Sequence, residues 1–278
     1  MKSIPLLAAA AALSFSITAH AENCAQLLES ITYSADGNNH HGHAALKAIL
    51  QSVTPSPTAD GSAFPLGKAL PNGGLGFPMW LTLVDGSGRV CAITNSLDGT
   101  THNSDVTADI WLASRIISAQ KANTANSLST SVLSLATANL YAAVQPGGSL
   151  FGLQESNPVN PTIAYDGDVF SYGTGQDPLV GERIGGVNVF GGGLALYSSA
   201  GKKIGAIGVS GDTSCTDHVT AWKVRAKLGL AYAGFGNFDK LIQDLQAPAG
   251  SQSGFGHPTC LNNPTAAQAG GSIVFNNP

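Results

Sequence analysis

Asp217 and His218 are the residues of this chain best placed to do chemistry. They lie in the first turn of an expected helix, directly after the glycine-rich strand end Val209-Ser210-Gly211. The positive end of the helix dipole disfavours an imidazolium, so a neutral His218 able to accept a proton or bind a metal is expected. A hydrogen-bonded capping pair is the competing interpretation. Adjacent helical side chains diverge by about 100°, so both cannot face one narrow site, and we favour His218.

The familiar catalytic and phosphate-binding motifs are missing from the sequence. It contains no G-x-S-x-G, P-loop or H-E-x-x-H motif. Gly191-Gly192-Gly193 precedes an expected strand rather than a helix, so it lacks the helix N-terminus that holds phosphate. Close backbone packing or a bulge is expected there. The glycines at 208–211, in contrast, are expected to leave room beside His218 for a bound molecule.

The cysteines predict disulfides rather than a metal site. All four follow residue 21, and no Cys/His spacing in the sequence suits zinc. Three pairings are open; we favour Cys24–Cys91 and Cys215–Cys260, each of which would tie a terminal segment to the body of the domain. His40-His41-x-His43 could bind a metal, but a solvated helix start explains it more simply.

The first 21 residues have the pattern of a secretory signal peptide. A basic start is followed by the apolar run 6–17 and by Ala19-His20-Ala21, a small-x-small cleavage site. Cleavage near Ala21 predicts a periplasmic or secreted protein, an environment that permits disulfides. No later apolar stretch is long enough to span a membrane.

Composition excludes two classes of protein. The 278 residues are 43% hydrophobic and 11% charged, which argues against intrinsic disorder. Lys and Arg number 13 against 17 Asp and Glu, and no basic block occurs. Nucleic-acid binding is therefore not expected.

The periodicity predicts an α+β fold with two hairpins. Helices are expected at 38–53, 105–127, 131–144 and 215–230, and strands at 78–84, 89–95, 194–197 and 203–209. This order predicts an antiparallel sheet of about five strands with helices packed on one side. The expected organisation is a signal peptide at 1–21, an N-terminal segment at 22–37, a domain at 38–230 and an irregular tail at 231–278. The Pro- and Gly-rich stretch 157–185 is expected to be a long functional loop inserted in the domain.

Five ordered segments resemble the GlcG/HbpS family of haem-binding proteins, the type also called domain of unknown function 336. They are Leu83-Val-Asp-Gly-x-Gly-Arg89, Asp98-Gly99, Lys121-Ala-Asn-Thr124-Ala, Phe190-Gly-Gly-Gly-Leu-Ala-Leu-Tyr197, and Gly201-Lys-Lys-Ile-Gly-Ala-Ile-Gly-Val-Ser-Gly211 with Asp217 and the following helix. The resemblance covers roughly 38–230 and implies a profilin- or PAS-like α/β domain that forms homo-oligomers. The insert and the Cys260 tail are additions to the short family core.

The resemblance implies haem or a similar small molecule as the ligand. Candidate binding residues in the matching segments are Asp217, Lys121, Thr124, Gly192 and Gly193. His218, favoured above for its position, is a further candidate and the candidate haem-iron ligand. A secreted binding protein for haem uptake, buffering or redox sensing fits the lack of an assembled catalytic set. The alternative is an enzyme acting on haem or a small organic ligand through Lys121, Asp217 and His218. A structural oligomer without a ligand is the third interpretation.

Overall fold

The computed structural model of the chain describes residues 23–35, 37–54, 70–97, 106–246 and 250–275. The expected signal peptide and the Asp98-Gly99 segment lie outside these residues. The main helices are α1 (Cys24–Ser30), α2 (Gly42–Val53), α3 (Ala113–Leu128) and α5 (Ser214–Leu228). The main sheet contains β3 (Trp80–Asp85), β4 (Val90–Asn95), β5 (Gly193–Tyr197) and β6 (Lys203–Ser210).

The two expected hairpins form one antiparallel sheet in the order β4-β3-β6-β5. The hairpins join where β3 pairs with β6, with Trp80 opposite Ser210 and Asp85 opposite Gly205. The α+β class is confirmed, but this sheet has four strands rather than about five. The other pairings are small: β1 (Thr32–Ala35) with β2 (Asn38–His41), β7 (Leu241–Gln243) with β10 (Ile273–Phe275), and β8 (Leu245–Gln246) with β9 (Gly250–Ser251).

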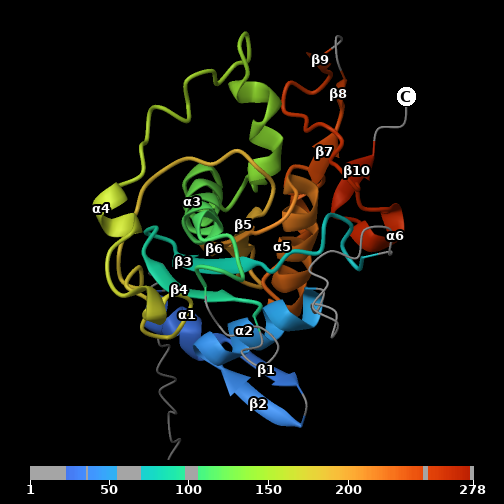
Figure 1. Cartoon of the computed structure of the whole chain (residues 1–278). Coiled ribbons are helices and arrows are strands. Elements are labelled where there is room, and N and C mark those ends of the chain that lie inside the picture. Colours follow the sequence, from blue (N-terminus) through green and yellow to red (C-terminus); the bar gives the residue numbers. More distant parts are fainter. Residues whose placement is uncertain (1–22, 36, 55–69, 98–105, 247–249, 276–278) are drawn as a thin grey trace, which may run out of the picture.

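Helices cover both faces of the sheet, which corrects the expectation of one (Figure 1). Side chains of a strand alternate between faces. Leu81 and Leu83 therefore join the core shared with α1, α2 and α5. Trp80 and Val84 face the core shared with α3 and the insert. Because both faces of β3 are covered in this way, all of its residues are buried.

Three of the expected helices are shorter in the structure, where the flanking residues contact other segments of the chain. The first begins at Gly42 because 38–41 pairs in the β1–β2 hairpin. The second begins at Ala113 rather than Asp105, and the carbonyl of Trp111 instead accepts a hydrogen bond from the Trp80 indole. The stretch 131–144 forms only 3-10 turns at Thr137–Leu140 and Ala142–Val144. There the Asn139 amide donates to the carbonyls of Phe238 and Lys240, so the turn is anchored to the tail.

Both favoured disulfides are present. Cys24 is joined to Cys91 and Cys215 to Cys260, and no free cysteine remains. They close separations of 67 and 45 residues. In the chain-entropy model each stabilises the fold by about 4 kcal/mol.

The insert and the tail are packed parts of the molecule rather than irregular connectors. The insert carries α4 (Pro161–Ala164) and a 3-10 turn at Val169–Ser171, and it covers part of α3. The tail carries a 3-10 turn at Ala233–Phe235, the strands β7 to β10 and α6 (Ala266–Ala269). Its apolar residues join the first turns of α5 in a separate cluster with Cys215 and Val219.

Candidate functional site

Lys121 and Asp217 form an ion pair inside the molecule, although 96 residues separate them. The Lys121 ammonium, from the middle of α3, lies 2.7 Å from Oδ2 of Asp217 in the first turn of α5. It also donates to the Val209 carbonyl at 3.0 Å and to the Ser210 hydroxyl at 3.3 Å. Oδ1 of Asp217 accepts from the Asp212 backbone N–H. Two of the residues implied by the family resemblance thus meet directly.

Burial makes this pair electrostatically unusual. Their side chains are only 1% and 3% exposed. Burial raises the pKa of Asp217 from 3.8 to about 7, although the Lys121 charge acts in the opposite direction. Burial also lowers the pKa of Lys121, again against the attraction of Asp217. Burial therefore favours the neutral form of both groups, and their mutual attraction favours the charged forms.

His218 points away from this pair and lies beneath the tail. Its Nε2 lies 3.1 Å from the carbonyl oxygen of Ser272, which can only accept, and 3.2 Å from the backbone nitrogen of Leu241, whose N–H can only donate. These two contacts favour opposite tautomers of the neutral ring. Nδ1 has no hydrogen-bond partner within the described part of the chain. Burial lowers the pKa of His218 to about 3. The imidazole is thus neutral at pH 7, as expected, but burial and not the helix dipole is the main cause.

The glycines near His218 are used for close packing and leave no space for a ligand. A Cβ on Gly191 would collide with the Ser214 carbonyl and touch Cβ of His218, and one on Gly192 would collide with the Val209 carbonyl. In β6, a Cβ on Gly208 would collide with the Ser118 carbonyl of α3. Backbone crowding explains the Gly191-Gly192-Gly193 run, as expected. A haem macrocycle does not fit beside His218 in this arrangement.

Thr124 and Gly193 lie close to the ion pair but make structural contacts. The Thr124 hydroxyl donates to the Gln120 carbonyl and accepts from the Asn188 N–H. Gly193 donates its N–H to the Thr137 hydroxyl. A Cβ on Gly193 would collide with Thr137 and with the Lys121 carbonyl. Gly193 thus lies against the backbone of Lys121, Thr124 bonds to Gln120 and Asn188 rather than to the ion pair, and His218 faces the tail.

Asp212 joins the loop 75–77 to the start of α5, a role that the sequence patterns did not predict. Its carboxylate accepts the backbone N–H groups of Leu75, Gly76 and Phe77, as well as that of Thr213. Burial raises the pKa of Asp212, and these four hydrogen bonds lower it. A polar residue between a strand end and a helix start is a recognisable anchoring signal.

A separate hollow of about 410 Å³ lies between the end of α2 and the end of α5. It is lined by Ser52, Val53, Thr54, Pro71, Lys223, Ala226 and Lys227. Small-molecule pockets usually measure about 300–1,000 Å³. The lining contains two ammonium groups but no His, Cys, Met or Tyr, the residue types that bind haem iron. It can accept carboxylates but offers no iron ligand.

The fold and the sequence place the chain in a known family. Residues 74–226 match the family model described as "HbpS-like: Haem degrading protein HbpS-like". This stretch covers more than half of the chain, and the protein belongs to that family. It contains the four-stranded sheet, α3, the insert and most of α5. The tail and α1 and α2 lie outside it.

Two solved structures show weaker likeness. One is the Klebsiella pneumoniae protein ORFY of the DUF336 family, with 23% identity, 68% of this chain and 90% of that chain covered, and a TM-score of 0.39. The other is a PduOC complex with haem, with 25% identity, 55% and 80% coverage, and a TM-score of 0.37. No curated protein matches the chain.

In the part of the chain that the structure describes, no helix is both long and apolar enough to cross a membrane.

Proposed function

We propose that this protein binds haem in an extracytoplasmic compartment, in uptake, buffering or redox sensing. Membership of the HbpS-like family over residues 74–226 carries the proposal. The two disulfides are consistent with an oxidising compartment, where such bonds form and persist. The expected cleavage near Ala21 and the expected homo-oligomer stay predictions.

His218 stays the candidate iron ligand under one structural condition. Because β7, β10 and Ser272 cover its imidazole, the tail must move before a haem can reach it. The unpartnered Nδ1 is the ring atom that such a movement would offer. The hollow beside Lys223 and Lys227 is the competing place, since it is already formed and its ammonium groups suit the haem propionates.

A hemin titration of the purified protein tests the proposal. We expect a Soret band that saturates at a fixed ratio of hemin to chain. A featureless titration, identical to hemin in buffer, would refute haem binding. His218→Ala is expected to change the position of the band, whereas Lys223→Ala/Lys227→Ala is the matched control at the hollow. An unchanged Soret band in a folded His218→Ala protein, together with weaker hemin binding in the Lys223→Ala/Lys227→Ala protein, would show that haem binds at the hollow.

A second function, an enzyme acting on haem or a small organic ligand, is supported by the Lys121–Asp217 pair. General acid–base groups work best when their pKa lies near the working pH, and the pKa of Asp217 is about 7. A structural ion pair would explain the same geometry without catalysis. Its buried position means that a substrate must open the site before the pair can act on it.

Loss of the Soret band of bound hemin, in air with ascorbate as reductant, tests the enzymatic alternative. Asp217→Asn removes the titrating carboxyl, so degradation should slow by about 100-fold if Asp217 transfers a proton. The control Arg183→Ala, at an exposed residue that bonds to Ser87, leaves both the pair and the hollow intact and should degrade hemin at the wild-type rate. Equal rates in wild type and Asp217→Asn would exclude a proton-transfer role for Asp217.

A further inference from the structure

The Cys215–Cys260 disulfide has a histidine beside it. Cys215 is the second residue of α5, Cys260 belongs to the tail, and the His257 ring lies next to both. One ligand atom of each residue lies within 4.8 Å of those of the other two. Cys215 and His257 are buried. The sequence showed no zinc spacing because Cys215 is far from the other two along the chain.

His257 is oriented as a metal-binding histidine would be. Its Nδ1 is 2.7 Å from the carbonyl oxygen of Pro258, which can only accept, so Nδ1 carries the proton. Its Nε2 lone pair then accepts from the Ser214 hydroxyl at 2.7 Å. The Ser214 oxygen accepts the Gly191 N–H through a lone pair, so its O–H proton remains available to donate to Nε2. Histidine ligands of metals commonly donate their other ring N–H to a backbone carbonyl in this way.

Hydrogen-bond donors surround the two sulfur atoms. The Cys215 backbone N–H donates to Sγ of Cys260 at 3.1 Å. The Gln243 amide donates to Sγ of Cys215 at 3.4 Å. Donors and the N-terminus of α5 stabilise negative charge on sulfur, and thiolates are the form of cysteine that binds metals.

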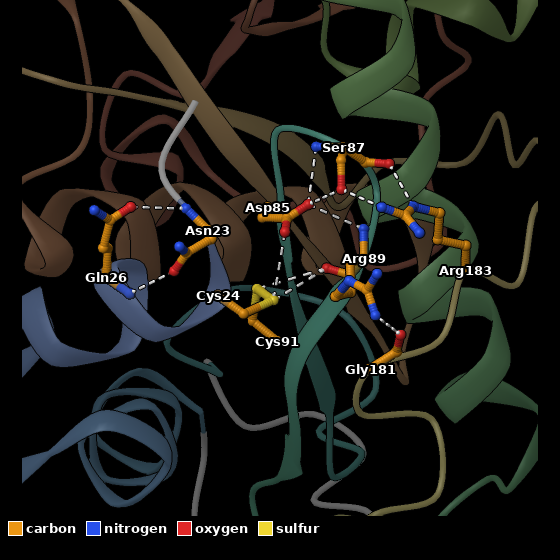
Figure 2. The surroundings of a disulfide bond; sticks show 9 residues. All are labelled: Asn23, Cys24, Gln26, Asp85, Ser87, Arg89, Cys91, Gly181 and Arg183. Carbon is orange, nitrogen blue, oxygen red and sulfur yellow. Dashed lines mark hydrogen bonds between the residues drawn. A yellow bond between two sulfur atoms is a disulfide. The ribbon is translucent and has the colours of Figure 1, made fainter. Parts of the chain in front are cut away.

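The second disulfide has the opposite surroundings and provides an internal control. Figure 2 shows Cys24 and Cys91 beside oxygen atoms that can only accept. Cys24 Sγ is 3.7 Å from Asp85 Oδ2 and 3.7 Å from the Arg89 carbonyl, which is also 3.5 Å from Cys91 Sγ. Oδ1 of Asp85 accepts the hydroxyl and N–H of Ser87 and the N–H of Arg89, and Oδ2 is the oxygen that lies beside Cys24. A carboxylate beside a sulfur opposes a thiolate by like-charge repulsion.

We propose that Cys215, His257 and Cys260 form a redox-dependent zinc site. A dithiol reductant transfers two electrons and two protons to the disulfide, breaks its S–S bond and leaves as a disulfide itself. Zn²⁺ then binds the two sulfurs and Nε2 of His257, which gives up its hydrogen bond from the Ser214 hydroxyl, and both thiol protons are released. Water takes the fourth position. The tail stays tied to α5 by a covalent bond in the oxidised state and by the metal in the reduced state.

Cobalt(II) and zinc(II) titrations test the site in a Cys24→Ala/Cys91→Ala chain, which keeps only this disulfide. After reduction with a dithiol and its removal under anaerobic conditions, we expect one Co²⁺ per chain with a sulfur-to-cobalt absorption band that Zn²⁺ abolishes. The oxidised chain should bind none. Adding His257→Ala should weaken Zn²⁺ binding at least 10-fold, because it removes one of three protein ligands. No band after reduction, or unchanged affinity in His257→Ala, would overturn the proposal.

Two further samples make the result independent of the folding of that variant. A reduced Cys215→Ala/Cys260→Ala chain retains Cys24, Asp85 and Cys91, whose ligand atoms also lie within 4.8 Å of one another, and it should bind Co²⁺ more weakly than the Cys24→Ala/Cys91→Ala chain; equal affinities would overturn the proposal. Reduced wild type, which needs no substitution, should melt at a higher temperature with Zn²⁺ than without it, whereas oxidised wild type should not change. Equal melting temperatures of the reduced protein with and without Zn²⁺ would overturn the proposal.

Discussion

Helix α3 carries two buried cations, and each pairs with an aspartate from a distant segment. Arg115 binds Asp177 of the insert through Nε at 2.9 Å and Nη2 at 2.5 Å, and its Nη1 donates to the Ala164 carbonyl. Its guanidinium also lies 3.6 Å from the centre of the Tyr172 ring. Lys121 instead binds Asp217 through one carboxylate oxygen. The side chains of both pairs are almost fully buried.

The difference between the pairs is one of chemistry. A guanidinium is always charged, and the Asp177 carboxylate also accepts the N–H groups of Gly173 and Leu179. The Arg115–Asp177 pair therefore keeps its charges and its geometry. An ammonium can lose its proton when buried, and the pKa of Asp217 is already about 7. We infer that Arg115–Asp177 holds the insert against α3, whereas Lys121–Asp217 can respond to pH.

Removing the fixed cation should have the largest effect. Arg115→Met leaves Asp177 buried without its cation, so the free energy of unfolding should fall by about 3–5 kcal/mol at pH 8. The loss should differ less between pH 5 and pH 8 than for Lys121→Met, because the Gly173 and Leu179 N–H groups still stabilise the carboxylate. Urea unfolding at both pH values measures it. Arg183→Met is the matched control, because that exposed arginine contacts only Ser87 and should cost under about 1 kcal/mol. A loss under about 1 kcal/mol for Arg115→Met would show that the insert is not held by this pair.

Asp217 should make stability depend on pH in a specific direction. Its folded pKa of about 7 lies above the ordinary 3.8, so between these values the folded protein holds a proton that the unfolded chain has released. The contribution of Asp217 therefore falls as pH rises from 4 to 7, by up to about 4 kcal/mol. Asp217→Asn should lose this slope. Parallel profiles of wild type and Asp217→Asn would contradict the raised pKa.

The difference between wild type and Asp217→Asn isolates this group from His218 and His257. Burial lowers their pKa values to about 3 and about 4, so each favours the folded state increasingly as pH rises toward 6.5. That slope has the opposite sign and is present in both proteins.

Lys121→Met should cost less than Arg115→Met and should depend on pH. At pH 5 Asp217 can keep a proton and become neutral, so the loss should be about 1 kcal/mol. At pH 8 the carboxyl must either stay charged without a partner or take a proton from a solution that holds few, so the loss should rise to about 3 kcal/mol. Unfolding of wild type and variant at the two pH values gives both numbers. Equal losses at pH 5 and pH 8 would mean that the second pair behaves like the first.

Arg115→Lys should have the smallest effect. It keeps the charge but removes the two parallel hydrogen bonds to Asp177, and it also weakens the contact with Tyr172. A loss of about 1–2 kcal/mol in urea unfolding is expected. A stability equal to that of wild type would show that charge alone, rather than the planar fork, holds the insert.

Local sequence patterns determined the two hairpins, the approximate place of α2 and α5, and the family. Alternating apolar residues around the Asp85–Gly88 and Ser198–Gly201 turns specify each hairpin, because turn geometry and strand pattern act over a few neighbouring residues. The favoured disulfides are confirmed: Cys24 and Cys260 lie in the segments that flank the domain, and each is joined to a cysteine within it. The polar start of α3 misled the prediction, because amphipathic spacing alone does not reveal where a helix begins.

Only the tertiary structure decided which side chains meet. Lys121 and Asp217 meet because α3 and α5 pack on opposite faces of the sheet and the Lys121 ammonium reaches the end of β6 at Val209 and Ser210. No local pattern encodes a contact across 96 residues. The pairing of β3 with β6 decided that helices cover both faces. The glycines of β6 serve helix packing, and the tail covers His218, because both depend on which distant backbone approaches them. Sequence neighbours specify local conformation, whereas burial, which sets the pKa values and the access to this site, is a property of the folded whole.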